Sequence, residues 1–260
     1  MIQAAYLSLF KGIANNLTFN GVNNYLRLLQ DERFKESVKN VFIYLVFQVP
    51  IMLILALILA SILNNKALGA KGLFRTLVFL PCAVSLAATA VIFRSVYSID
   101  GLANTVLTGL KIIPAPINWI SDPFWAKVVI IMVITWRWTG YNTIFYLAGM
   151  QNISSEVYEA ARIDGAKVVQ QFFRITLPLL KPVIILTSIM STNGTLQIFD
   201  EPRILTNNNA NSPIVSISQY IYNISFVNNP QFGYAAAASY TILFMVAALS
   251  LIQLKLGDRK

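Results

Sequence analysis

Five long apolar segments constrain the fold of this chain more than any other feature. They cover approximately residues 38–63, 73–93, 126–150, 182–199 and 232–254, and the fourth is the most polar of them. A helix needs about 20 residues to cross the hydrocarbon core of a bilayer, where the backbone must satisfy its own hydrogen bonds. The sequence therefore predicts an all-α fold, a polytopic transmembrane helical bundle in which five spans are visible.

The composition agrees with a membrane protein and excludes several functions. Charged residues make up 12% of the chain, against about 25% in typical soluble proteins, and the mean hydropathy is +0.61. The net charge of +9 is spread between the apolar segments, which argues against nucleic acid as a partner. There is no histidine and only one cysteine, Cys82. These counts exclude Ser-His-Asp and Cys-His catalytic centres and an intrachain disulfide.

Basic residues alternate between the predicted loops, and this alternation indicates the orientation of the chain. The loops after the first and third spans and the tail are rich in them: Lys66, Lys71, Arg75, Arg162, Lys167, Arg174, Lys181, Lys255, Arg259 and Lys260. The opposite loops, at about 94–127 and 200–231, contain only Arg94, Lys111, Lys127 and Arg203. By the positive-inside rule, the first set of loops is cytoplasmic.

The first 37 residues are polar and contain no apolar run that could serve as an anchor. Alternation places them outside the membrane, although a basic segment of this size seldom crosses alone. We therefore expect residues 1–37 to be an extracytoplasmic segment that follows a missing first span. Six spans would then leave both ends in the cytoplasm. Residues 38–256 would form the transmembrane domain and residues 257–260 a cytoplasmic tail.

The predicted cytoplasmic loop at 151–181 carries the most specific local pattern. Ser154 and Ser155 can cap a short helix, and Gly165 is a natural stop for it. A second amphipathic run follows at 168–175. Such helices could rest on lipid headgroups or dock into a partner protein.

Several residue types recur at fixed offsets in this loop. Three residues separate Glu159-Ala160-Ala161 from Gly165, and nine residues separate Gly165 from Ile175-Thr176-Leu177-Pro178. This spacing resembles the EAA signature of binding-protein-dependent ABC importer permeases. Other stretches are similar to the carbohydrate branch of that family, the maltose- and lactose-type permeases: Phe74-Arg75-Thr76, Trp136-Arg137-Trp138-Thr139-Gly140-Tyr141-Asn142 and Gln197-Ile198-Phe199-Asp200. The chain departs from the family pattern in lacking the usual first span. It also has Asn207-Asn208-Asn209-Ala210 where a Gly-Gly-Gly-Pro-like turn is usual.

The resemblance implies a transmembrane subunit of a type I importer in the cytoplasmic (inner) membrane, which forms half of a sugar pathway. The implied partners are a second, homologous permease in a heterodimer, an ATP-binding cassette ATPase dimer, an extracytoplasmic sugar-binding protein and membrane lipid. The residues expected to couple the chain to the ATPase are Glu159, Ala160, Ala161, Asp164, Gly165 and Pro178. The chain has no Walker A sequence, so ATP and Mg are expected on the ATPase, with no cofactor on this chain.

Polar and aromatic side chains in the third and fourth spans are candidates for the pathway, because sugars combine apolar faces with hydroxyl groups. These candidates are Trp138, Tyr141, Asn142, Asn193 and Gln197. The polar ones could equally make hydrogen bonds between helices, and the tryptophans could pack in the core or anchor at the interface. Arg137, the one charge deep in a span, could contact substrate or brace a neighbouring helix. In the outer loop, Tyr220 and Tyr222 are candidates for docking the binding protein.

Three alternatives stay open from the residues alone. The same type of permease could carry another solute, such as glycerol phosphate or amino acids. A secondary transporter is a remote alternative, because no Asp or Glu lies within the five spans to couple protons. A membrane enzyme is the third, and the absence of histidine speaks against it.

Overall fold

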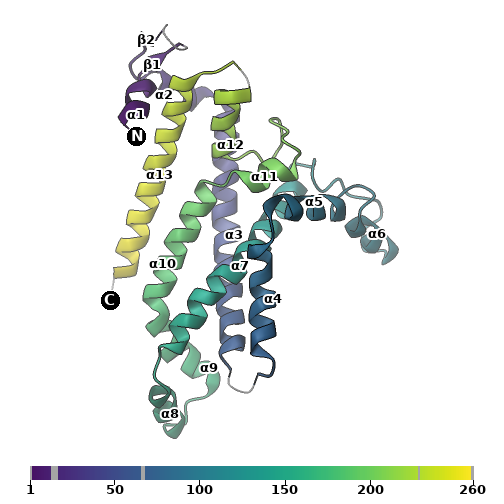
Figure 1. The fold of residues 1–260 in the computed structure, drawn as a ribbon, viewed down its shortest axis with the longest axis vertical. Helices are drawn as coiled ribbons and strands as arrows, with labels where there is room; N and C mark the ends of the chain where they lie inside the picture. Colours follow the sequence, from purple (N-terminus) through teal and green to yellow (C-terminus); the bar gives the residue numbers. More distant parts are fainter. Residues whose placement is uncertain (1, 13–16, 66–67, 228, 259–260) are drawn as a thin grey trace. The chain divides into compact units, whose positions relative to one another are not determined.

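A computed structural model describes residues 2–12, 17–65, 68–227 and 229–258, so the predicted cytoplasmic residues Lys66, Arg259 and Lys260 lie outside the described part. The described chain is almost entirely helical (Figure 1). Its elements are α1 (Ile2–Ser8), β1 (Phe10–Lys11), β2 (Thr18–Phe19), α2 (Asn23–Gln30), α3 (Glu32–Asn64), α4 (Lys71–Ala83), α5 (Leu86–Val96), α6 (Leu102–Gly109), α7 (Trp125–Gln151), α8 (Ser155–Ile163), α9 (Val168–Gln171), the π-helical turn η1 (Phe172–Thr176), α10 (Leu177–Leu196), α11 (Asp200–Leu205), α12 (Ile217–Tyr222), the π-helical turn η2 (Asn223–Val227) and α13 (Phe232–Asp258).

The prediction of five membrane spans agrees with the structure for four of them. Among the described residues, four helical stretches are long and apolar enough to cross a bilayer: Glu32–Asn64, Trp125–Gln151, Val168–Leu196 and Phe232–Gly257. Helices α4 and α5 meet the same criterion only as a pair bent by 92°, which is either a fifth, broken span or a re-entrant loop.

The predicted second span, at 73–93, is not one continuous helix. Val84 and Ser85 have extended backbone, with ψ angles of 140° and 143°, and they separate α4 from α5. The Ser85 Oγ accepts a hydrogen bond from the Ala88 N–H at 3.2 Å and so caps the start of α5. Hydropathy missed the break because the residues around it are apolar on both sides.

The predicted fourth span, at 182–199, begins and ends a few residues after the corresponding helix in the structure. Helix α10 starts at Leu177 and contains Pro182, and it ends at Leu196. The π-helical turn η1 joins α10 to α9, so the helical stretch begins before the proline at which the prediction placed its start.

The chain divides into two compact units, which we describe separately. The first comprises residues 1–48, 85–134 and 193–249, and the second comprises residues 49–84, 135–192 and 250–260. Helices α3, α7, α10 and α13 each contribute residues to both units.

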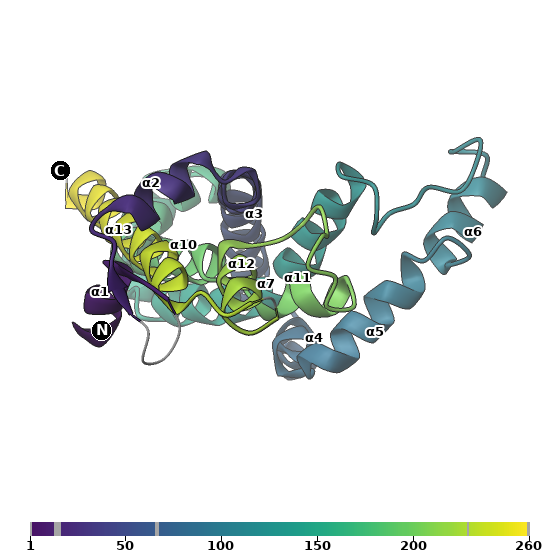
Figure 2. The same ribbon diagram turned by 90° about the horizontal axis from the view of Figure 1, so that it is seen from above.

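In the first unit, the N-terminal segment is folded rather than extended. Strands β1 and β2 form an antiparallel hairpin in which Phe10 pairs with Phe19. Figures 1 and 2 show α1, the hairpin and α2 gathered beside the first turns of α13. Arg27 holds α2 against the start of α13. Its Nη1 donates to Gln231 Oε1 at 2.6 Å, and its guanidinium lies 4.2 Å from the ring centroid of Tyr234.

Asp31, between α2 and α3, connects this segment to α12 and α13. Its Oδ1 accepts from the Phe34 N–H at 3.0 Å, and its Oδ2 accepts from the hydroxyls of Tyr220 at 2.7 Å and Tyr234 at 2.9 Å. Burial opposes ionisation of Asp31, but the hydrogen bonds from Tyr220, Phe34, Tyr234 and the Arg33 backbone hold its pKa below the usual value. The carboxylate therefore stabilises the folded first unit.

In the second unit, α4, α7 and α10 pack closely. A Cβ at Gly140 would collide with the backbone carbonyl of Val78, so only glycine allows α7 to approach α4 this closely. Tyr146 on α7 is fully buried, and its hydroxyl lies 2.8 Å from Thr187 Oγ1 on α10. These contacts fix the two helices between which α8 and α9 are inserted.

Candidate functional site

Helix α8 contains three of the six predicted coupling residues, Glu159, Ala160 and Ala161, and both of its ends are capped. The Ser154 Oγ accepts from the Glu156 N–H at 3.3 Å, so the first of the two predicted serines is the N-cap residue. Glu156 also lies in the first turn, where the helix dipole favours a negative charge. Arg162 stays local, since its Nε donates to the Tyr158 carbonyl at 3.4 Å.

Helix α8 ends at Ile163, and a hydrogen-bonded turn at Gly165 stops it. Gly165 has a φ of +78°, in the left-handed region that glycine adopts without strain. Its N–H donates to the Arg162 carbonyl at 3.0 Å, and the Ala166 N–H donates to the Ala161 carbonyl at 2.9 Å. Asp164, which lies between Ile163 and Gly165, is the C-cap residue of α8. This pair of bonds is the Schellman arrangement, and it makes the turn after α8 depend on glycine.

Side-chain amides stabilise the turn into α9 by hydrogen bonds, and a further hydrogen bond joins α8 to η1. Lys167 N–H donates to Gln170 Oε1 at 2.8 Å, and Gln171 Nε2 donates to the Ala166 carbonyl at 2.8 Å. The Tyr158 hydroxyl lies 2.8 Å from Thr176 Oγ1. Figure 1 shows α8 and α9 beyond the ends of α7 and α10. These contacts connect α8 to the π-helical turn that leads into α10.

The surface of this loop is exposed and partly apolar. None of the residues of α8 is buried. Ile163 is 87% exposed, and three further apolar side chains in α9 and η1 are also exposed: Val168, Val169 and Phe173. Glu159, Ala160, Asp164, Gly165 and Pro178 are exposed, and Ala161 is half-buried. Exposed apolar side chains close together in the chain are typical of a surface that binds a partner protein or lipid.

In the predicted pathway, Asn142 joins helices instead of facing a cavity. It is only 3% exposed. Its Nδ2 donates to the Trp138 carbonyl at 3.1 Å and lies 3.6 Å from Met52 Sδ on α3, and its Oδ1 accepts from Ser191 Oγ on α10 at 3.4 Å. These contacts favour the helix-to-helix alternative for this residue.

The other pathway candidates keep some exposed surface. Trp138 and Tyr141 are half-buried, with ring centroids 6.0 Å apart in an edge-to-face arrangement. Asn193 is half-buried, and Gln197 is exposed and lies one residue beyond the end of α10. The Gln197 N–H donates to the Asn193 carbonyl at 3.2 Å, so a helical turn still relates the two residues.

Arg137 braces the break between α4 and α5. It is 7% exposed, and its Nη1 donates to the Val84 carbonyl at 2.9 Å. The extended backbone at Val84 ends the helical hydrogen-bonding of α4. The structural alternative for Arg137 therefore has a direct contact to support it.

Two glutamines, buried Gln48 and half-buried Gln253, make polar contacts between helices that the sequence did not predict. Gln48 on α3 accepts from Thr195 Oγ1 on α10 at 3.0 Å, in the first unit. Gln253 Nε2, near the end of α13, donates to Thr192 Oγ1 at 2.7 Å, in the second unit. An amide within an apolar span was the available signal for both.

The structure corrects the docking hypothesis for Tyr220. Its side chain is 6% exposed and its hydroxyl is bonded to Asp31, so it cannot offer a docking surface. Tyr222 is half-buried, and the Arg203 guanidinium lies 4.2 Å from its ring centroid.

Comparisons with known proteins agree with this geometry. The model of a family described as "Binding-protein-dependent transport system inner membrane component" matches residues 32–255. The lactose transport system permease protein LacF of Rhizobium radiobacter is 50% identical over 97% of this chain and 86% of its own length. The trehalose/maltose transport system permease protein MalF of Thermococcus litoralis is 35% identical over 92% of this chain and 80% of its own.

A solved structure has the same fold. It is the bacterial alginate ABC transporter in complex with an alginate pentasaccharide-bound periplasmic protein. One of its chains is 25% identical to this chain, with a TM-score of 0.78, and the match covers 92% of this chain and 83% of that one.

Proposed function

This chain belongs to the family of binding-protein-dependent transport system inner membrane components, and from this premise we propose that it is a permease subunit of an ATP-driven carbohydrate importer. It would form half of the translocation pathway in the cytoplasmic membrane. It would carry no catalytic site of its own, and a separate ATPase would bind ATP and Mg. The single observation that carries the coupling part of the proposal is α8, an exposed and doubly capped helix at the position of the family signature.

Helix α8 is suited to transmit a partner's movement. Its small residues, Ala160 and Ala161, let the backbone of another protein approach closely, while Glu159 offers a charge to a basic or polar group. Gly165 fixes the turn, with Asp164 as its C-cap neighbour. Pro178, at the start of α10, stiffens the segment through which motion would reach the membrane.

The substrate class rests on the relatives. The lactose transport system permease is 50% identical to this chain over 97% of the chain, and the trehalose/maltose permease is 35% identical over 92% of it. We retain Trp138 and Tyr141 for their ring faces, and Asn193 and Gln197 for their amides, as proposed pathway residues, because sugars bind to groups of these kinds. The side-chain amide of Asn142 is engaged in hydrogen bonds within and between helices, so we do not include Asn142 among the proposed sugar contacts.

The proposed assembly needs several partners. A homologous second permease would supply the other half of the pathway in a heterodimer, two ATPase subunits would dock on the cytoplasmic loops, and a sugar-binding protein would deliver substrate from outside. In this orientation the loop at 151–181 is cytoplasmic and residues 1–37 are extracytoplasmic. The complex of the alginate transporter with its loaded periplasmic protein supports the last partner by analogy.

The test is uptake by the reconstituted complex. The chain should be purified with its native companions, placed in lipid vesicles with the binding protein outside and ATP inside, and assayed with labelled lactose and maltose. Unlabelled sugars, glycerol phosphate and amino acids should then compete. We expect ATP-dependent uptake that sugars inhibit. Uptake of an amino acid or glycerol phosphate in preference to any sugar would refute the substrate class.

A matched pair of substitutions tests the coupling helix. Ala160→Trp places a large side chain on the exposed face of α8, and Ala115→Trp places the same side chain at an exposed position between α6 and α7. We expect Ala160→Trp to abolish copurification of the ATPase at normal membrane levels, because the bulky ring prevents close approach. Ala115→Trp should retain it. Normal ATPase binding by Ala160→Trp would contradict the assignment.

A further inference from the structure

A cavity lies within the first unit, and none of the residues that line it is a candidate for the coupling loop or for the pathway. It has a volume of about 810 Å³, which is within the range of roughly 300–1,000 Å³ typical of small-molecule sites. Its walls come from the end of α5, from the segments that flank α6, and from the chain that follows α11. By the predicted orientation, these segments are extracytoplasmic.

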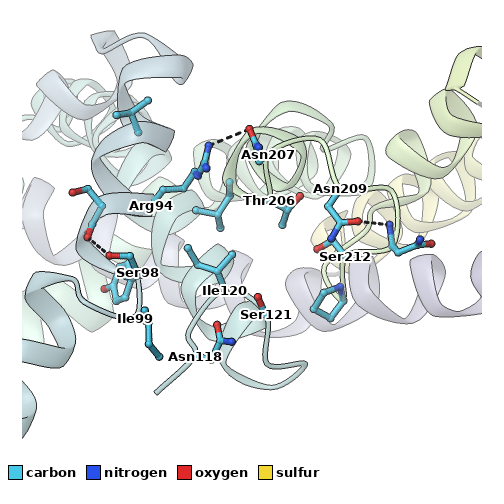
Figure 3. A pocket seen from close by; sticks show the side chains of 16 residues that line it. Arg94, Ser98, Ile99, Asn118, Ile120, Ser121, Thr206, Asn207, Asn209 and Ser212 are labelled. Carbon is cyan, nitrogen blue, oxygen red and sulfur yellow. Dashed lines mark hydrogen bonds between the residues drawn. The ribbon is translucent and has the colours of Figure 1, made fainter. Parts of the chain in front are cut away.

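The lining of this cavity is rich in groups that bind hydroxyls. Its polar side chains are amides and hydroxyls, with Tyr97 and a single cation, Arg94. Among the described residues, none of those that line it is acidic. Figure 3 shows Arg94 and Asn207 on one side of the cavity and Asn118 and Ser121 on the facing side. Amides both donate and accept, so the two walls together match the alternating needs of sugar hydroxyls.

The Arg94 wall is held in place by an unusual stretch of backbone. Asn207 and Asn208 have φ angles of +54° and +61°, and asparagine is the side-chain-bearing residue that tolerates this region well. Asn207 Oδ1 accepts from Arg94 Nη1 at 3.3 Å, and Asn208 Oδ1 accepts from Arg203 Nε at 2.9 Å. Glycine would permit the same turn but would provide neither amide. No carboxylate within the described residues lies within 4.0 Å of Arg94, so its remaining donors are not committed to an ion pair.

The facing wall is organised by Asn104, which is 2% exposed. Its Nδ2 donates to the carbonyls of Ile99 and Ile117, both at 2.9 Å, and its Oδ1 accepts from the Ile117 N–H at 2.9 Å and from Trp119 Nε1 at 2.8 Å. This one side chain joins the segment after α5 to the segment before α7. The ring of Trp119 lies 5.8 Å from that of Tyr97, centroid to centroid. The cavity walls are therefore fixed before any ligand arrives, which reduces the entropy cost of binding.

We infer that this cavity is an outer sugar-binding subsite, which receives a carbohydrate on the extracytoplasmic side before it enters the membrane pathway. The inference rests on the proposed function and adds a named site to it. Arg94 and Asn207 would bind one pair of sugar hydroxyls, and Asn118 would bind another. The ring of Tyr97 would lie against the apolar face of the sugar ring. A concave, polar and prebuilt cavity fits a small solute better than it fits the surface of a protein.

Direct binding to the assembled complex tests the inference. The complex in lipid nanodiscs, without binding protein or ATP, should be titrated with lactose or maltose, whichever it imports better, by saturation-transfer NMR. Arg94→Gln should weaken binding about tenfold and Asn118→Ala about 2- to 10-fold, because a charged and a neutral hydrogen bond are lost. Lys111→Gln and Asn23→Ala change an exposed cation and an exposed amide outside the lining and should leave affinity unchanged.

Uptake measurements separate this inference from the alternatives. In vesicles, Arg94→Gln and Asn118→Ala should leave the half-saturating concentration of the loaded binding protein unchanged. If that concentration rises while free-sugar binding is normal, the cavity is a protein-docking surface and the inference is overturned. It is also overturned if both variants bind sugar like the wild type. Failure of the wild-type complex to import any sugar would instead refute the proposed function.

Discussion

The turn at Gly165 provides the sharpest test of the coupling loop. At a φ of +78°, a residue with a Cβ costs about 1–2 kcal/mol, and valine is among the worst because it is β-branched. If the turn rearranges instead, the two hydrogen bonds to the Arg162 and Ala161 carbonyls are lost, at about 1 kcal/mol each. Either route destabilises the native turn by about 2 kcal/mol, which lowers the equilibrium constant for forming it about 30-fold.

Helix α8 cannot absorb such a cost. It has nine residues, none of them buried, and helices shorter than about 12–15 residues are marginal on their own. The Gly165→Val variant should therefore lose the defined end of α8 while the packing within each of the two units stays intact. Its melting temperature should stay close to that of the wild type.

The assay compares sugar uptake and ATP hydrolysis in the same vesicles. We expect Gly165→Val to reduce uptake at least about tenfold and to lower the amount of sugar moved per ATP. Gly165→Asn should retain most activity, because asparagine is enriched in left-handed backbone. Gly69→Val is the control: Gly69 also lies in a predicted cytoplasmic loop, its φ is not positive, and nothing lies within 4 Å of an added Cβ. Wild-type coupling in Gly165→Val, or equal loss in Gly69→Val, would refute the reasoning.

Three further predictions concern stability. Gly140→Ala should destabilise the protein by about 2 kcal/mol through overpacking, whereas Gly194→Ala, with open space around its Cβ, should be neutral or stabilising in thermal unfolding; equal effects would contradict the close helix contact. Because the pKa of Asp31 is lowered on folding, its contribution is complete above the unfolded value of 3.8 and is lost as the pH falls through the folded pKa. Melting temperatures measured from pH 6 to pH 3 should therefore fall less steeply for Asp31→Asn than for the wild type, and identical slopes would count against this role. Asn104→Ala should cost about 2 kcal/mol and change the fluorescence of Trp119, whereas an unchanged emission spectrum would show that the loop does not depend on this amide.

Local sequence determined the features that depend on local physics. Apolar length identified the membrane-crossing segments, because burial in lipid is decided by about 20 consecutive residues. Serine before α8 and glycine after it predicted both ends of that helix, because caps are made within one turn. The coupling role of the residues in this loop came from the resemblance of their spacing to the family signature, and it stays a prediction.

Tertiary structure alone decided which polar residues are available. Asn142 makes its contacts with α3, α7 and α10, and the sequence could not distinguish it from an amide that faces open space. Nor could it show that Tyr220 is buried against Asp31, a residue 189 positions away in the chain. The cavity beside Arg94 joins segments more than 100 residues apart. Pairing over such separations depends on how helices pack, and helix packing is set by the shapes of whole surfaces rather than by any short stretch of sequence.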